Sequence, residues 1–403
     1  MLTSELNLPH GLREREFPIT VECTYLNAAT QGPLPTSTCR AIEQAAMRAQ
    51  FPDTPRAHVD QPSADLARAR LARLLGVGED DLAFTPNTTH GLNICAHGID
   101  WRPGDNVVLP EREFPSLLRV WLHLRSSGVD VRCVPWQGDG PSVEALMAAV
   151  DSRTRVVSCS AVAWDSGYRI DLEALGRRCA QAGCLLVVDG IQAVGAVELN
   201  PQSLRLSALS FHGYKWLLSG FGCGALYVAP SAIDQIRPSF VGEQSFVGDG
   251  DPSDTPAVWQ PGARRYTVGG ANALGLTALA ASLALIERVG LGTIDAHNRA
   301  LGQLLVDGLR RHAPDIRLVS PVDPAQRAAI VVFTLGDHAR DEALVRRLGE
   351  EGIMVALRPR GVRVSPHLYN SAAEIERLLH AIQPAIEVSH QHKNTPLAAP
   401  EVL

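Results

Sequence analysis

The apolar run Cys184–Val188 constrains the fold most, because polar and apolar side chains do not alternate along it. A strand that is apolar on both faces belongs inside a parallel sheet that helices cover on both sides. Further strands are expected at Asn106–Pro110, Val131–Pro135 and Arg155–Ser160, and helical segments separate them. This alternation predicts an α/β fold with a large doubly wound, mostly parallel sheet and right-handed crossovers.

Two ionisable residues follow strands of this sheet. Asp189 stands directly after the apolar run, at the carboxyl end of the strand, where ligands bind in open parallel sheets. A carboxylate is costly there unless it meets a cation. Lys215 follows a second apolar strand, Ala208–Phe211, and is the only lysine for a long way in either direction. Burial favours its neutral amine, which is the form that attacks an aldehyde.

Together these two residues meet the chemical needs of pyridoxal phosphate (PLP). An Asp at the pyridinium nitrogen and a Lys at the aldehyde are the protein groups that this cofactor requires. The spacing of 26 residues from Asp189 to Lys215 leaves room for one crossover and a strand. Separately, each has an ordinary interpretation: a helix N-cap or metal ligand for Asp189, and a snorkelling side chain for Lys215. The pair favours the cofactor, and we expect no metal site.

The segments VVDGIQAVG (187–195) and SFHGYKWLLSGFGCGALYV (210–228) closely resemble fold-type I PLP-dependent enzymes of the aminotransferase class V group. That group contains cysteine desulfurases, isopenicillin N epimerase-like proteins and C–S lyases, and the resemblance extends from Tyr25 to about Ile382. It implies that Lys215 forms the Schiff base with the cofactor and that Asp189 holds the ring nitrogen, so both are catalytic. It also places Gln192 against the phenolic oxygen of the ring.

The phosphate of the cofactor is expected at the start of a helix. The stretch 82–98 predicts a strand, a Thr/Asn cap and a helix, and free backbone N–H groups at a helix N-terminus bind anions. The resemblance places Thr88 and Thr89 in this cradle. It also places His212 and Tyr214, just before Lys215, on the phosphate side.

Two further cofactor contacts are implied by the resemblance. The group sets an aromatic ring or a histidine flat on the cofactor after the strand Asn106–Pro110, where this chain offers Phe114; ordinary core packing is the alternative. Relatives donate a Gly-Thr-Pro-Asn segment to the phosphate of the neighbouring subunit. The matching stretch here contains Gly270 and lacks the threonine hydroxyl. We expect Gly270 to contribute backbone contacts in a homodimer whose active site lies at the subunit interface.

The small-molecule substrate is expected to be an amino acid bound by Arg363. This arginine stands mid-strand between two valines, where an unpaired guanidinium is expensive and a bidentate carboxylate removes the cost. The resemblance assigns it the substrate α-carboxylate, and a structural ion pair with Glu374 or Glu376 is the alternative.

Other substrate contacts are expected from two loops. The resemblance places the stretch 24–35 over the active site, so we expect Asn27 and Ala29 to contact the substrate, with a simple linker turn as the alternative. Trp164 follows the end of the strand Arg155–Ser160 and therefore points at the same edge of the sheet.

The predicted organisation has four parts. Residues 1–24 form an N-terminal arm that packs on the small lobe, and residues 25–270 form the large PLP-binding domain. Residues 271–390 form a small α+β domain with long helices at Ala273–Val289 and Leu291–Arg311 and a strand at Ile353–Leu357. Residues 391–403 form a tail.

Charge and composition exclude several classes of protein. The net charge is −6, which favours neither nucleic acid nor a membrane surface as a partner. No apolar run reaches the roughly 18 residues of a membrane-spanning helix, and residues 1–16 lack the apolar region of a signal peptide. The eight cysteines show no CxxC spacing and are typical of reduced core residues, so we expect a cytoplasmic protein.

The cysteines also bear on the reaction. A desulfurase of this group needs a nucleophilic thiol on a loop of the small lobe, but no cysteine follows Cys223. This absence, with Phe114 in place of a histidine, argues against a persulfide-forming cysteine desulfurase. We expect β-elimination from a cysteine S-conjugate, the reaction of a C–S lyase.

Alternatives within PLP chemistry stay open. Transamination or decarboxylative deamination is one, and epimerisation is another, which needs a second acid–base group such as His90, Tyr25 or His367. Outside enzymes, a PLP-binding sensor is disfavoured because no basic DNA-binding module precedes Tyr25. A nucleotide-binding Rossmann protein is disfavoured because no GxGxxG follows an early strand.

Overall fold

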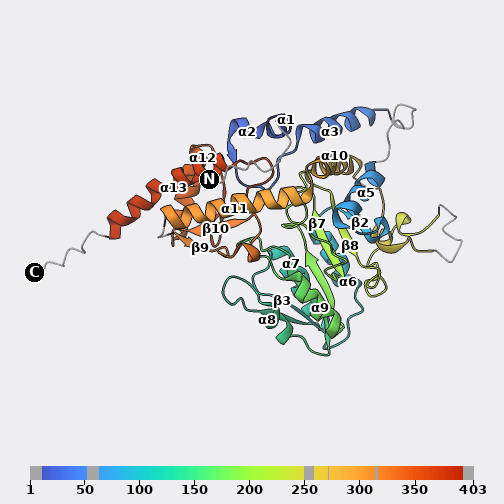
Figure 1. The fold of residues 1–403 in the computed structure, drawn as a ribbon. Coiled ribbons are helices and arrows are strands. Elements are labelled where there is room, and N and C mark those ends of the chain that lie inside the picture. Colours follow the sequence, from blue (N-terminus) through green and yellow to red (C-terminus); the bar gives the residue numbers. More distant parts are fainter. Residues whose placement is uncertain (1–10, 52–62, 249–257, 271, 314–315, 394–403) are drawn as a thin grey trace, which may run out of the picture.

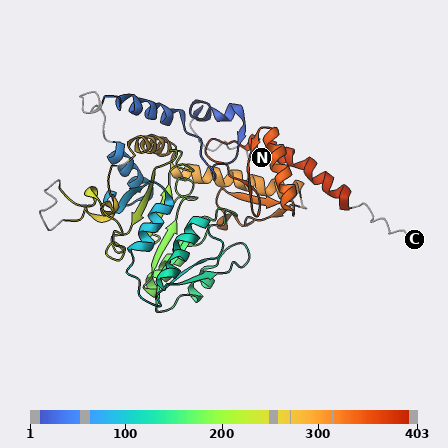
Figure 2. The same ribbon diagram turned by 180° about the vertical axis from the view of Figure 1, so that it is seen from behind.

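The structure is a computed structural model that describes residues 11–51, 63–248, 258–270, 272–313 and 316–393. Two views from opposite sides show a large sheet, coloured cyan to yellow-green, at one side of the molecule (Figure 1 and Figure 2). A smaller sheet with orange and red helices lies at the other side. The blue N-terminal helices run along one edge and join the two regions.

The large sheet has seven strands and carries the main core. In spatial order they are β2 (Leu82–Thr85), β8 (Gly224–Val228), β7 (Ala208–His212), β6 (Leu185–Asp189), β5 (Thr154–Ser160), β3 (Asn106–Pro110) and β4 (Asp130–Val134). Neighbouring strands pair in parallel, except that β8 is antiparallel to both β2 and β7. Strands β3, β6, β7 and β8 are buried along their whole length. The predicted mostly parallel, doubly wound sheet is confirmed.

Helices separate these strands in the sequence. They are α6 (Thr88–Gly98), α7 (Pro115–His123), α8 (Val143–Ala148) and α9 (Leu172–Ala182), while α5 (Ser63–Leu75) precedes β2. Short 3₁₀ turns are η1 (Glu79–Asp81), η2 (Leu124–Ser127), η3 (Glu243–Ser245), η4 (Gly262–Tyr266) and η5 (Pro324–Gln326). Helix α6 packs directly on β7 at Gly91. This position has no room for a side chain, because a Cβ there would come within 2.3 Å of the Ser210 hydroxyl oxygen. This contact brings the first turn of α6 to the carboxyl end of β7.

The small sheet is antiparallel and has the order β12 (Ala356–Arg358), β13 (Gly361–Val364), β10 (Val331–Thr334) and β9 (Arg317–Leu318). Helices α11 (Leu291–His312), α12 (His338–Glu350) and α13 (Ala372–Lys393) pack around it, whereas α10 (Ala273–Val289) packs on α5 and contributes to the main core. In the described part of the chain no single helix is long and apolar enough to cross a membrane. Helices α10 and α11 pass that test only together, and a 78° bend separates them.

The N-terminal segment comprises α1 (Leu12–Glu16), α2 (Ile19–Glu22), β1 (Thr24–Tyr25) and α3 (Thr36–Arg48). Strand β1 pairs in parallel with β11 (Ile353–Met354). The prediction of one strand over Ile353–Leu357 is therefore wrong, because its first half pairs with this distant segment and its second half becomes β12. The predicted domain boundaries stay predictions, and residues 394–403 of the predicted tail lie outside the described residues.

Candidate active site

A cavity of about 340 Å³ opens at the carboxyl ends of the large sheet, beside the small sheet. Seven residues predicted from the sequence line it: Ala29, Phe114, Trp164, Gln192, Tyr214, Lys215 and Arg363. Thr30, Leu357, Arg358 and Pro359 complete the lining. The fold thus brings together residues from the N-terminal segment, the large sheet and the small sheet.

Lys215 is 6% exposed, and its Nζ lies 5.9 Å from the centre of the Phe114 ring. Burial, together with the nearby Arg363 guanidinium, lowers the pKa of Lys215 to about 7, although Asp189 opposes this shift. The backbone of Lys215 packs closely against Gly32. A Cβ at position 32 would come within 2.1 Å of the Lys215 carbonyl oxygen, so only glycine fits there. Within the described residues Nζ has no hydrogen-bond partner, and with this lowered pKa the amine that faces the cavity has a substantial neutral fraction near pH 7.

Asp189 ends β6 and is 3% exposed. Its Oδ1 accepts a 2.9 Å hydrogen bond from the backbone N–H of Ile191, the one hydrogen bond to this carboxylate within the described residues. Burial raises the pKa of Asp189, while the Ile191 N–H and the Lys215 ammonium oppose that rise. A buried carboxylate with so few partners retains capacity for a cation.

The predicted phosphate cradle lies at the start of α6. Asn87 caps this helix, since its Oδ1 accepts a 2.9 Å hydrogen bond from His90 N–H. The Thr88 carbonyl accepts a 2.8 Å hydrogen bond from Ser210 on β7, and the buried Thr88 hydroxyl finds no partner among the described residues. Thr89 is half-buried, and its carbonyl accepts a hydrogen bond from Asn93. The capping pattern predicted from the sequence is therefore present.

His212 ends β7 and is 7% exposed. Its Nε2 accepts a 3.1 Å hydrogen bond from the backbone N–H of Gly222, so the ring proton resides on Nδ1. Burial lowers the pKa of His212 to about 4, and Lys215 adds to this shift. Tyr214 contacts the His212 ring edge-on at 4.6 Å and stacks on Phe221 at 4.4 Å. His212 therefore offers a neutral N–H donor.

Gln192 is 3% exposed and is held at both ends of its amide. Its Nε2 donates to the Ala29 carbonyl at 3.1 Å, and its Oε1 accepts from the Trp216 indole at 2.9 Å. Phe114 is 37% exposed and meets the Trp164 ring edge-on at 5.5 Å. These contacts fix the walls of the cavity around Lys215.

Arg363 is 2% exposed and reaches the cavity from β13. Its Nη1 donates to the Trp164 carbonyl at 3.0 Å and its Nη2 to the Thr30 hydroxyl at 2.6 Å, while Nε has no partner within the described residues. Burial, then repulsion from Arg358, lowers the pKa of Arg363 to about 9. The alternative ion pair with Glu374 does not form, because that carboxylate pairs with Arg13 at 3.1 Å.

The Thr30 hydroxyl is a shared anchor. It accepts from Arg363 and, at 2.7 Å, from Arg358, and it donates to the Asn27 side-chain oxygen at 2.6 Å. This use of one proton and two lone pairs completes its hydrogen-bonding capacity. Asn27 is absent from the cavity lining and supports Thr30 from behind. Neither guanidinium has a carboxylate partner among the described residues, so both retain capacity for an anionic ligand.

Gly270 is exposed and lies outside the cavity lining, with open space where a Cβ would stand. Two residues further on, Asn272 caps α10 and donates to the Gly222 carbonyl at 3.2 Å. The segment is therefore anchored beside the turn that contacts His212. Within one chain Gly270 makes none of the predicted contacts with the site.

Glu113, which lies near Asp189, was not predicted from the sequence. Its carboxylate accepts hydrogen bonds from the Ser160 backbone N–H, at 2.8 Å, and from the Ser160 hydroxyl. Ser160 pairs with Asp189 in the β5–β6 ladder, and Glu113 directly precedes Phe114. Burial raises the pKa of Glu113 to about 7 against these hydrogen bonds, and Asp189 adds to the rise. The available signal was an acidic side chain one residue before the predicted stacking ring.

The comparisons define the class of protein. The family model of aminotransferase class-V matches residues 61–378, and the chain belongs to this family. A probable cysteine desulfurase from Methanothermobacter thermautotrophicus is 27% identical over 384 residues, which cover 90% of this chain and 95% of the relative.

Solved structures agree on the fold. The apo cysteine desulfurase from Thermococcus onnurineus NA1 superposes with a TM-score of 0.85 at 23% identity, covering 94% of this chain and 98% of the other. The cystine C–S lyase C-DES, solved with its reaction product cysteine persulfide, gives a TM-score of 0.83 at 25% identity, covering 91% and 99%. A mutant of C-DES with glycine covalently linked to its PLP cofactor gives 0.83 at 26% identity, covering 92% and 98%. The chain is a PLP-dependent enzyme of fold type I.

Lys215 and its surroundings fit PLP, although Asp189, Thr88 and His212 lie outside the lining of the cavity. The buried Thr88 hydroxyl has no partner where the phosphate is predicted, and Asp189 is a buried carboxylate that retains capacity for a cation. Lys215 presents an amine of lowered pKa to the cavity. Lys215 would hold the aldehyde carbon, Asp189 the ring nitrogen, and Thr88 with His212 the phosphate. We call these residues the cofactor side, and Thr30, Trp164, Arg358 and Arg363 the substrate side.

Proposed function

We propose that the protein is a C–S lyase that cleaves cysteine S-conjugates by β-elimination, with Lys215 as the PLP-binding residue and general base. The observation that carries this proposal is the composition of the cavity. A buried amine of lowered pKa faces two guanidinium groups that have no carboxylate partner among the described residues, and no thiol lines the cavity.

Substrate binding is assigned to the substrate side. Arg363 binds the α-carboxylate, where a charge-assisted bidentate pair supplies both energy and orientation. Arg358, joined to Arg363 through the Thr30 hydroxyl, adds positive charge beside it. Ala29 and Trp164 form the adjoining wall, and we propose that they contact the substrate.

Proton transfer is assigned to Lys215. When bound, PLP supplies the electron sink for the charge that develops at the substrate α-carbon. Nζ of Lys215 accepts the α-proton, a role that suits a pKa near the working pH. Asp189 supplies the negative charge that keeps a proton on the ring nitrogen, and Phe114 shields one wall of the cavity from water.

The overall reaction balances without an oxidant. The Cα–H and Cβ–S bonds break, the electron pair of the first forms a Cα=Cβ bond, and sulfur leaves with the pair of the second. The released thiolate takes a proton, and hydrolysis of the C–N bond then gives pyruvate and ammonium. A cysteine S-conjugate and one water thus yield a thiol, pyruvate and ammonium.

The name cysteine desulfurase, which several relatives carry, describes a different use of the same cofactor. That reaction needs a protein thiol as sulfur acceptor. All eight cysteines of this chain lie in its described part and all are free, but none lines the cavity. The C–S lyase named among the solved structures, with cysteine persulfide as its product, supports the elimination we propose.

Epimerisation lacks a second acid–base group at the cavity. His367 is completely buried with both ring nitrogens hydrogen-bonded. The Tyr25 hydroxyl donates to the Gln31 carbonyl at 2.8 Å, and His90 packs against Phe240. None of these three candidates lines the cavity.

We also propose a homodimer with the active site at its interface. Phe240 and Val241 are exposed by 41% and 52%, and the adjoining Gly242 packs on the carbonyl oxygen of Val268, itself 38% exposed. Because Phe240 touches His90 in the first turn of α6, this apolar patch borders the predicted phosphate cradle. A partner seated there would bring Gly270 of one subunit toward the other subunit's site.

The free state of all eight cysteines supports a proposal of cytoplasmic location, since disulfides form in oxidising compartments.

The test of function is a product assay with the PLP-loaded protein and a set of substrates: cystine, S-substituted cysteines, and free cysteine. We expect pyruvate and thiol, or persulfide from cystine, in equal amounts. Alanine with transferred sulfur would instead identify a desulfurase, and a keto acid without thiol release an aminotransferase. Inversion at the α-carbon without cleavage would identify an epimerase.

A further inference from the structure

His367 lies just after β13, six residues from the start of that strand. Substrate binding by Arg363 on the same segment does not account for His367. Its side chain is 0% exposed. Nε2 stands 3.0 Å from the Trp216 carbonyl oxygen, and Nδ1 stands 3.2 Å from the Asn298 side-chain nitrogen. A carbonyl only accepts, so Nε2 carries the proton and Nδ1 accepts from Asn298. Burial lowers the pKa of His367 to about 3, which keeps this neutral form across the working pH range.

The partner of His367 is the residue next to the catalytic lysine. Trp216 follows Lys215, is 1% exposed, and meets the His367 ring edge-on at 5.2 Å. Its indole N–H donates to Gln192, which lines the cavity. The backbone and the ring of Trp216 are thus held from two directions, and the direction in which Lys215 leaves the chain is fixed with them.

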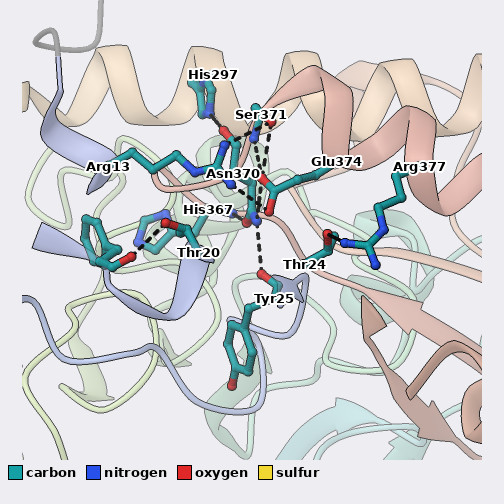
Figure 3. A network of polar contacts seen from close by, with 11 residues as sticks. Arg13, Thr20, Thr24, Tyr25, His297, His367, Asn370, Ser371, Glu374 and Arg377 are labelled. Carbon is teal, nitrogen blue, oxygen red and sulfur yellow. Dashed lines mark hydrogen bonds and ion pairs between the residues drawn. The ribbon is translucent and has the colours of Figure 1, made fainter. Parts of the chain in front are cut away.

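His367 is itself rigidly mounted. Its backbone N–H donates to the Asn370 side-chain oxygen at 2.9 Å, and Asn370 donates in turn to the Tyr25 carbonyl at 3.0 Å. The Asn370 carbonyl accepts from His297 at 2.9 Å, as Figure 3 shows. The same close-up shows that this network gathers the N-terminal segment, α11 and the start of α13 around one loop.

We propose that His367 is a positioning residue that holds Lys215 in its reactive direction through the Trp216 carbonyl. Because His367 follows Arg363 by four residues on one segment, it also ties the lysine to the arginine that binds the substrate. This inference rests on the proposed role of Lys215 as the PLP-binding residue. His367 touches neither the cofactor nor the substrate.

The test compares two substitutions in the PLP-loaded enzyme. His367→Gln keeps an N–H donor and an oxygen acceptor, whereas His367→Phe keeps the ring and removes both hydrogen bonds. For His367→Phe we expect kcat to fall about 30-fold with KM within about 2-fold, since only the lysine is displaced. The visible circular dichroism of the bound cofactor should change with it. His367→Gln should recover both signals to within about 3-fold.

Two controls separate positioning from general loss of packing. His297→Gln alters another buried histidine of the same network, 7% exposed, which has no hydrogen bond or ring contact with Trp216 within the described residues, and it should leave the visible circular dichroism unchanged. Asn298→Ala keeps His367 but removes the donor to Nδ1, and serves if His367→Phe does not fold. It should shift the pH dependence of the visible absorbance and lower kcat about 5-fold.

Unchanged visible circular dichroism and kcat in His367→Phe, or in Asn298→Ala if the former does not fold, would overturn the inference. So would equal losses in His367→Phe and His367→Gln, because these would indicate packing alone. The proposed function fails separately, if borohydride reduction of the unmodified protein attaches no PLP to Lys215.

Discussion

The cofactor side and the substrate side of the cavity are built from different kinds of contact. Asp189 and Lys215 stand at the ends of adjacent strands, and the one hydrogen bond to Asp189 within the described residues comes from two residues away. Arg363 instead depends on Thr30 and Trp164, which are 333 and 199 residues away in the sequence. The first side is formed by the large sheet and the first turn of α6 that packs on it, whereas the second exists only when three distant segments meet.

This difference separates two functions. The cofactor side is rigid because β6 and β7 are buried along their whole length. The substrate side is held by one hydroxyl, Thr30, which binds two guanidinium groups that repel each other. Substitutions on the cofactor side should therefore act on turnover, and substitutions on the substrate side should act on substrate affinity.

Asp189→Asn should give the largest effect short of removing the lysine. Without the carboxylate the ring nitrogen is not held in its protonated form, so we expect kcat to fall about 1000-fold. Steady-state kinetics beside an equilibrium titration with PLP measure this, and PLP affinity should fall by less than about 10-fold. Equal losses in both would show that Asp189 is only structural.

Arg363→Ala should raise KM about 100-fold, since a charge-assisted pair with the substrate carboxylate is lost. The visible spectrum of the bound cofactor should stay unchanged, because no cofactor contact is removed. Arg327→Ala is a matched control, as this buried arginine binds the Pro321 carbonyl and Gln303 and does not line the cavity. If KM for every amino acid tried is the same in Arg363→Ala, the carboxylate role is wrong.

Thr30→Val should raise KM about 10-fold with kcat nearly unchanged, because both guanidinium groups lose their shared acceptor. Thr30→Ser keeps the hydroxyl and should restore KM to within about 2-fold. A drop in kcat with normal KM in the valine variant would show that the two sides of the cavity are not separable in the way described here.

The smallest effect concerns pH. Burial lowers the pKa of Lys215 to about 7, so its neutral fraction in the apoprotein rises through neutral pH. The rate at which PLP attaches to the apoprotein, followed by visible absorbance, should increase with pH and level off a unit or so above that midpoint. A rate that keeps rising toward the ordinary lysine pKa of about 10.4 would contradict the burial argument.

The sequence predicted the cofactor side better than the substrate side for physical reasons. A strand that is apolar on both faces, followed by Asp or Lys, identifies the carboxyl edge of a parallel sheet from local pattern alone. The anchoring of Arg363 by Thr30 leaves no local signal, because it depends on how two regions pack. The position of Glu113 could not be predicted for the same reason, since its partner Ser160 lies on β5, 47 residues away in the sequence.

The strand error has the same origin. The pattern over Ile353–Leu357 is continuous, but Ile353 and Met354 pair with Thr24 and Tyr25 of the N-terminal segment. Local pattern correctly indicated extended backbone there and carried no information on the partner. Long-range pairing is therefore where predictions for this chain are weakest.

The most direct test of the account is to reduce the PLP-loaded protein with borohydride and map the modified peptide by mass spectrometry. The chain has only one other lysine, Lys393, which serves as an internal control. We expect the pyridoxyl group on Lys215, none on Lys393, and none at all in Lys215→Ala. A label on Lys393, or a label that persists in Lys215→Ala, would contradict the assignment of Lys215.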